Sequence, residues 1–201
     1  MPKIEYIDQT HQYMIDGILV PSVTTLVAYA TGDIYKDIPE AILEKARIRG
    51  TGVHDSIEYY EKTGDFVEEY ADEIHRYIEL KRVNNLNKVK DMEQIVHYKH
   101  YYCGRYDILD ENGFLWDIKA TAKYHQENLE WQLGLYYLAL GKEITSWEEI
   151  GDDGKPKRVS SIKGYCIHLP RNLTKAKVYL VEPRSTKECI DLIETYESSK
   201  H

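Results

Sequence analysis

The chain has 201 residues, of which 42% are hydrophobic and 30% charged, and its formal net charge is −8. This composition fits one well-buried globular core, excludes a disordered or fibrous chain, and does not favour nucleic-acid binding over the whole surface. The sequence lacks both a run of the ~18 apolar residues that a membrane span needs and an amino-terminal stretch of signal-peptide type, so we expect a cytoplasmic protein without membrane contacts.

The amino-terminal part is predicted to form a small hairpin followed by helices. Residues 4–20 alternate weakly in polarity, which indicates short strands. Ser22 is placed to cap a short helix, and Pro39 is placed to begin a second helix. We expect that second helix to stop near residues 49–52, where glycines occur and a new helix begins. Apolar spacing over residues 67–86 predicts a further helix.

Strand and helix patterns alternate in the rest of the chain. In order, they predict a strand over 93–102, a hairpin over 104–119, a helix over 127–140, a loop over 151–156, strands over 162–169 and 176–181, and a helix over 186–197. The whole order predicts an α/β fold in which helices flank a central mixed sheet. We expect one domain over residues 1–201, with a hairpin and helices over 1–90 and the catalytic core over 91–201.

The hairpin over residues 104–119 is the most informative segment. Glycine at position 113 stands where a three-residue loop needs a left-handed residue. That loop predicts these cross-strand pairs: Asp110 with Phe114, Leu109 with Leu115, Ile108 with Trp116, Asp107 with Asp117, and Arg105 with Lys119. One face then carries an apolar set, namely Tyr106, Ile108, Phe114, Trp116 and Ile118. A two-residue turn would mix apolar and charged residues on both faces, because a one-residue slip reverses every side chain.

The opposite face of this hairpin brings two carboxylates together. Asp107 would lie directly across from Asp117, with Lys119 two residues further on. Like charges opposite one another are destabilising, and a divalent metal ion is the simplest compensation. Carboxylates and the backbone carbonyl of Ile118 are hard oxygen ligands suited to Mg²⁺ or Mn²⁺, and the lysine could position an attacking water. The alternative is a surface hairpin with solvated charges.

Four short elements in this order resemble the PD-(D/E)xK nuclease superfamily, and most closely its RecB-like branch, which includes phage exonucleases. The matching residues are Gly50 to Glu58 around His54, Gly104 to Asp107, Asp117 to Lys119, and Gln132 to Tyr136. The resemblance implies a restriction-endonuclease-like core that binds one or two Mg²⁺ or Mn²⁺ ions. It does not imply an iron–sulfur cluster, because Cys103, Cys166 and Cys189 are scattered and the cluster-bearing members use grouped cysteines.

The resemblance also implies roles for single residues. His54, Asp107 and Asp117 would be metal ligands, Lys119 the catalytic lysine, and Glu93 a further acidic ligand. Gln132 and Tyr136 would lie one helical turn apart over the site, where they could orient Lys119 or a phosphate. The alternatives are a structural or solvated histidine and ordinary polar positions on a packed helix.

Basic residues near the site and after it are candidates for binding DNA. From Gly154 to Lys177 the chain has seven Lys or Arg and no acid, although a solvated loop would explain this equally well. The candidate residues are Arg47, Arg49, Arg105, Lys155, Lys157 and Arg158.

The expected function is a metal-dependent DNA exonuclease of phage or bacterial end processing, recombination or repair. The expected partners are DNA and either a second copy of the chain or a recombination or replication protein. The alternatives are a structure-selective or restriction-type endonuclease, a catalytically silent nucleic-acid-binding module, or a metal hydrolase acting on another substrate.

Overall fold

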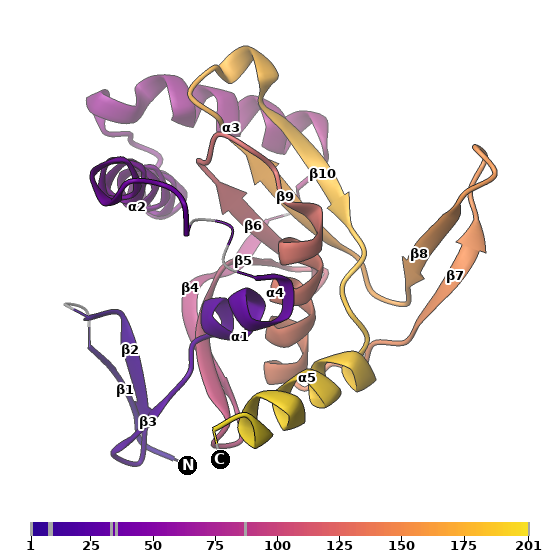
Figure 1. Ribbon diagram of the computed structural model, residues 1–201. Coiled ribbons are helices and arrows are strands. Elements are labelled where there is room, and N and C mark those ends of the chain that lie inside the picture. Colours follow the sequence, from indigo (N-terminus) through magenta and orange to yellow (C-terminus); the bar gives the residue numbers. More distant parts are fainter. Residues whose placement is uncertain (1, 8–9, 33, 35, 87, 201) are drawn as a thin grey trace.

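A five-stranded mixed sheet forms the centre of the computed structural model, which describes residues 2–7, 10–32, 34, 36–86 and 88–200. Its strand order is β10-β9-β6-β5-β4, with β6 and β9 parallel and the other neighbours antiparallel. The strands are β4 (Val89–Tyr98), β5 (Tyr102–Asp110), β6 (Leu115–Lys119), β9 (Gly164–His168) and β10 (Lys177–Val181). With helices on both faces, this sheet confirms the predicted fold class (Figure 1).

Two groups of helices cover the two faces of the sheet. They are α2 (Glu40–Thr63) and α3 (Ala71–Val83) on one face, and α1 (Val23–Thr31), α4 (Gln126–Ala139) and α5 (Thr186–Ser198) on the other. Short 3₁₀ turns lie at Glu68–Tyr70 and Leu173–Lys175. Among the described residues, no helix combines the length and apolar character needed to cross a membrane.

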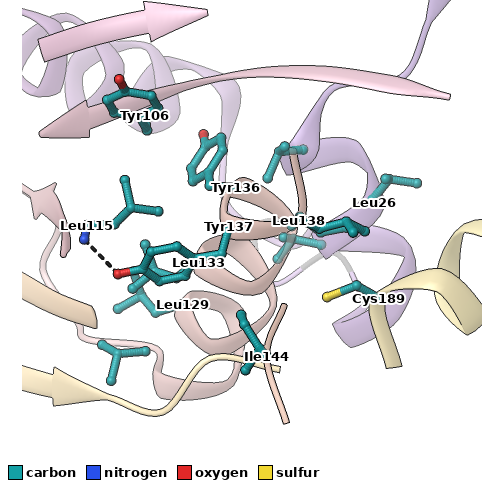
Figure 2. Close-up of a cluster of buried hydrophobic side chains, with 14 of the residues drawn as sticks. Leu26, Tyr106, Leu115, Leu129, Leu133, Tyr136, Tyr137, Leu138, Ile144 and Cys189 are labelled. Atoms are coloured by element: carbon teal, nitrogen blue, oxygen red, sulfur yellow. Dashed lines mark hydrogen bonds between the residues drawn. The ribbon is translucent and has the colours of Figure 1, made fainter. Parts of the chain in front are cut away.

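The cluster around α4 holds more buried hydrophobic side chains than the cluster on the other face of the sheet, and Figure 2 shows part of it. Leu129, Leu133 and Tyr137 of α4 pack on the sheet, and the Tyr137 hydroxyl accepts a hydrogen bond from the backbone N–H of Leu115 at 2.7 Å. The other face is filled from α2 and α3, with Ile57 and Tyr77 fully buried. Both faces of the sheet therefore lie in apolar surroundings. Burying a charged side chain on either face costs free energy unless the charge is paired.

The short amino-terminal strands, predicted as a small hairpin, form a separate three-stranded meander of β1 (Ile4–Ile7), β2 (Gln12–Ile15) and β3 (Ile18–Val20). The meander joins the main sheet through Cys103, whose N–H donates to the carbonyl of Pro21 at 3.1 Å. A small apolar cluster of Tyr13, Ile15, Val20 and Cys103 fills the junction. Ser22 then caps α1 as expected, its hydroxyl accepting from the N–H of Thr25 at 3.0 Å.

The predicted interruption near residues 49–52 is wrong, because α2 runs through it without a break. Glycine within a helix costs about 1 kcal/mol relative to alanine. At Gly52 the missing side chain makes room for Tyr70, since a Cβ there would lie 2.1 Å from the tyrosine hydroxyl oxygen. Tertiary packing thus explains a glycine that local propensity alone reads as a helix end.

Two strand predictions also need correction. The strand expected over residues 93–102 spans a turn, since β4 ends at Tyr98 and β5 begins at Tyr102. The hairpin of β7 (Ser146–Ile150) and β8 (Pro156–Ser160) was not predicted; it projects from the body of the molecule (Figure 1). Its exposed, mostly polar residues give no apolar alternation, so periodicity offers no signal.

The predicted register of the β5–β6 hairpin is confirmed at its closed end. Ile108 pairs with Trp116 and Leu109 with Leu115, and Gly113 has a φ of 82°. Tyr106 was placed on the wrong face: it packs in the α4 cluster with its ring 6.5 Å from that of Tyr136, whereas Ile108 packs under α2 and α3. The regular alternation of β5 therefore breaks between these residues, at Asp107.

An ion-pair network holds α5 against the β7–β8 hairpin and yields a pH prediction. Glu188 pairs with Arg158 at 2.8 Å and closes a capping box with Ser185. Burial opposes its charge, but Arg158 and Ser185 together lower the pKa of Glu188 to about 2. A lowered carboxyl pKa stabilises the fold above the ordinary value near 4.5 and loses that effect as pH falls towards 2.

We therefore expect Glu188→Gln to lower the free energy of unfolding by about 1–2 kcal/mol at neutral pH, a value reduced for the partial exposure of the group. The difference from the wild type should shrink as pH falls below about 4.5 in urea unfolding curves. Exposed Glu194 on the same helix gives the matched control, Glu194→Gln. A pH-independent difference would contradict the assignment.

Candidate metal centre

The strands β5 and β6 separate just beyond the pair of Ile108 and Trp116. The carboxylate of Asp107 lies in the opening, where its Oδ2 accepts a hydrogen bond from the backbone N–H of Ile118 at 2.6 Å. The next two predicted pairs, Asp107 with Asp117 and Arg105 with Lys119, do not form. A side-chain oxygen has replaced the backbone partner of Ile118, so the two strands cannot stay in register.

Three predicted ligands meet at this opening, each from a different element. His54 of α2, Glu93 of β4 and Asp107 of β5 each offer one ligand atom, and these atoms lie within 4.8 Å of one another. The Nδ1 of His54 lies 3.5 Å from Glu93 Oε1 and 3.5 Å from Asp107 Oδ1. Its Nε2 donates to the carbonyl of Ile118 at 2.9 Å, which directs Nδ1 to the carboxylates. These three residues, here called the ligand trio, could hold a metal ion.

Two observations show that the ligand trio fits a cation. Glu93 Oε1 of the trio is buried without a hydrogen-bond partner among the described residues, and so is Asp117 Oδ2 of β6, in the group beside the trio. An unpartnered buried acceptor is costly, and a hard divalent ion would satisfy it. Glu93 also has a φ of 49° within β4, a left-handed conformation that costs a non-glycine residue roughly 1–2 kcal/mol. Such strain is typical of functional sites.

The charges of the ligand trio depend on one another. Burial disfavours a charged imidazole, but Asp107 and Glu93 outweigh it and raise the pKa of His54 to about 10. Burial likewise opposes the charge of Asp107, yet His54 and then Lys119 hold the pKa of that carboxyl below its ordinary value. The trio thus carries a proton between two carboxylates, and a metal ion bound there would take its place.

Asp117, Lys119 and Gln132 form a second group beside the trio. The Lys119 ammonium donates to Asp117 Oδ1 at 2.8 Å and to Gln132 Oε1 at 3.1 Å, and Gln132 Nε2 donates to the same Asp117 oxygen at 2.9 Å. Burial, together with Asp107, raises the pKa of Asp117 to about 6 against the effect of Lys119. Burial opposes the ammonium, but Asp117 and Asp107 raise the pKa of Lys119, which stays charged.

The two predicted residues of α4 have different contacts. Gln132 reaches the Asp117–Lys119 pair, whereas the Tyr136 hydroxyl donates to the backbone carbonyl of Arg105 at 2.7 Å. The tyrosine ring also lies against Gly104, where a Cβ would be 2.7 Å from its Cε1. Tyr136 therefore fixes the backbone of β5 beside Asp107 rather than the lysine, and the glycine permits this close approach.

The ligand trio opens into a cleft of about 340 Å³. Arg47, Arg105 and Gln132 also line this cleft, as do two residues absent from the predicted set, Tyr6 and His11. Apolar periodicity does not mark these two as site residues, because they reach the cleft through the docking of β1–β3. Lys119 borders a neighbouring hollow of about 230 Å³, which shares Gln132 with the cleft.

The other basic candidates lie away from the cleft. Arg49 contacts Glu73 at 2.9 Å and the carbonyl of Ala120 at 2.5 Å, so its guanidinium ties α2 to α3 and to the end of β6. Arg158 is engaged by Glu188, and Lys155 and Lys157 are exposed on the β7–β8 hairpin. Of the six candidates, Arg47 and Arg105 are the two that border the cleft.

No protein-family model and no curated protein matches the sequence. Among solved structures, that of SSO0001 aligns with a TM-score of 0.47 and 18% identity over 90% of this chain and 77% of its own. A phage-related exonuclease from Haemophilus somnus 129PT aligns with a TM-score of 0.42 and 10% identity over 88% and 89%. Both TM-scores lie below 0.5, and function is therefore inferred from the geometry of the site.

Proposed function

We propose that the protein is a metal-dependent nuclease that hydrolyses phosphodiester bonds in DNA, as an exonuclease of end processing, recombination or repair. The observation that supports this best is the meeting of the ligand trio with the Asp117–Lys119 pair where β5 and β6 separate. Imidazole and carboxylate donors suit Mn²⁺ or Mg²⁺, and a buried ammonium beside them suits the charge that develops on a phosphoryl group.

Each group has a defined task in this mechanism. An ion held by His54, Glu93 and Asp107 would polarise a phosphoryl oxygen and acidify the attacking water. Lys119 would hold that water and stabilise the negative charge of the transition state, while Gln132 and Asp117 Oδ1 fix the position of its ammonium. The second oxygen of Asp117 has no partner among the described residues and is open to the ion or to the water.

The proposal is tested by cleavage of end-labelled linear DNA and closed-circular DNA with Mn²⁺, Mg²⁺ or EDTA. We expect metal-dependent release of nucleotides from linear DNA and no cutting of the circle. Cutting of the circle would instead assign an endonuclease on the same fold. Cleavage that persists in EDTA, or no cleavage of either substrate with any metal, would overturn the proposal.

Lys119→Met should separate the chemical step from metal binding. We expect the cleavage rate to fall by about 10²–10³-fold, because the charge beside the reacting phosphate is lost. The rise in melting temperature on adding Mn²⁺ should remain, because the ligand trio is intact. Lys142→Met, which removes an exposed lysine just after α4, is the matched control. A loss of the Mn²⁺ response in Lys119→Met would show that the lysine acts on the ligands instead.

A further inference from the structure

The meander of β1–β3 contributes a wall to the cleft that holds the ligand trio. The Tyr6 hydroxyl lies 2.6 Å from His11 Nδ1, and the opposite ring nitrogen, Nε2, lies 2.9 Å from Arg47 Nη1. The guanidinium of Arg105 stands over the Tyr6 ring, 5.7 Å from its centroid. A continuous set of contacts therefore joins the meander to an arginine of α2 and an arginine of β5.

Arg105 is held in place yet keeps free donors. The backbone carbonyl of Arg105 accepts a hydrogen bond from Tyr136, and its Nε lies 2.9 Å from Glu93 Oε2. Its guanidinium covers the Tyr6 ring. The Tyr13 ring packs against that of Tyr6, with 4.9 Å between the ring centroids. The side chain is nevertheless 44% exposed. Within the described residues, neither Nη nitrogen has a hydrogen-bond partner. A fixed guanidinium with unused donors is prepared for an anion, since little conformational entropy remains to be lost.

Arg47 lies on the same face of α2 as His54, two helical turns earlier. Its Nε and Nη2 pair with Glu44 at 2.9 and 2.8 Å, and 56% of the side chain is exposed. An exposed pair of this kind contributes only about 0–1 kcal/mol. Glu44 therefore offers weak competition to a phosphate, while His11 still holds the third guanidinium nitrogen.

We propose that Arg47 and Arg105, positioned by Tyr6 and His11, form a second phosphate site in the cleft. This second site binds an uncleaved phosphodiester of the DNA strand whose scissile phosphate lies at the ligand trio. The planar guanidinium suits this task because its paired donors match phosphate oxygens. The choice of DNA rests on the proposed function, but binding at this site can be measured without cleavage.

The test is the salt dependence of binding to a short fluorescein-labelled single strand with phosphorothioate linkages, in Mg²⁺. Each phosphate contact that is lost should lower the slope of log K against log salt by about 0.7. We expect this change in Arg47→Gln and in Arg105→Gln, with affinity about three- to tenfold weaker at low salt. Arg82→Gln is the matched control, because Arg82 is exposed on α3 and lines a different hollow. This variant makes the same change in net charge and should leave the slope unchanged.

Variants of Tyr6 test positioning apart from charge. Tyr6→Leu removes the ring under Arg105 and should weaken binding without changing the net charge, and Tyr6→Phe, which keeps the ring, should restore most of the affinity. Slopes in Arg47→Gln and Arg105→Gln equal to that of Arg82→Gln, or no binding by the wild type, would overturn the second site. Metal-dependent cleavage with unchanged slopes would refute this site alone. Altered slopes in a protein that cleaves nothing would refute the nuclease alone.

Discussion

Asp107→Asn is expected to abolish the stabilisation by Mn²⁺ and to lower DNA cleavage by at least about 10³-fold, the equivalent of roughly 4 kcal/mol in the transition state. Asparagine keeps the shape of the side chain and an oxygen for the N–H of Ile118, but it removes the charge that faces His54. The metal-free variant should still fold, because the side chain keeps its shape and the hydrogen bond to Ile118.

The two halves of this expectation are measured separately. Thermal unfolding is followed with and without Mn²⁺, where a bound ion at 100 times its dissociation constant adds about 2.7 kcal/mol. Cleavage is followed on the same linear DNA as for the wild type. Asp91→Asn, elsewhere on the sheet at β4, provides a matched loss of one carboxylate. A Mn²⁺ response of wild-type size in Asp107→Asn would exclude this residue as a ligand.

Asp110→Ala is expected to affect the stability of the fold instead of metal binding. We expect it to lower the free energy of unfolding by about 3 kcal/mol or more. Asp110 is fully buried, and its carboxylate accepts hydrogen bonds from the N–H groups of Asn112 and Phe114, both at 2.9 Å, and from the Trp116 indole at 3.1 Å. Alanine would leave these donors without an acceptor, at about 1–3 kcal/mol for each one that stays buried.

Chemical denaturation measures this loss, and Asp110→Asn is the graded control. Asparagine keeps one acceptor for the two backbone donors of the turn, so its cost should be smaller than that of alanine. The folded fraction of either variant should still respond to Mn²⁺, because Asp110 lies outside the ligand trio. A cost below about 1 kcal/mol for alanine would mean that water replaces the carboxylate at the turn.

These two aspartates show what could be predicted from the sequence. Both lie in β5, and residue type alone does not distinguish a metal ligand from the acceptor that closes a turn. The loop separates the two roles. Gly113 sets the register at the closed end of the hairpin, and this register places Asp110 beside Phe114 in the turn. Regular local signals of this kind, including the cap at Ser22 and the apolar spacing of α4, were sufficient to predict most elements of the fold.

The features that were wrong or unforeseen depend on contacts distant in sequence. Gly52 within α2 is explained by Tyr70, and the separation of β5 from β6 is explained by a side chain that takes a backbone hydrogen bond. The left-handed backbone of Glu93 follows from no local preference. His54, Asp107, Asp117 and Glu93 were all predicted as ligands, but only the folded chain shows that Glu93 lies with His54 and Asp107 while an oxygen of Asp117 pairs with Lys119.

Because α2 is unbroken, it sets the distance between two positions at which a substrate strand would be bound. A helix of 24 residues is a rod about 36 Å long, and Arg47 and His54 are separated on it by about 10 Å of axial rise. The interval between a gripped phosphate and the reactive centre would then be set by a stiff element rather than by a loop. A strand whose phosphate spacing matches this fixed distance would place a phosphate at the ion. A strand with a different spacing would bind at the arginines without placing a phosphate at the ion.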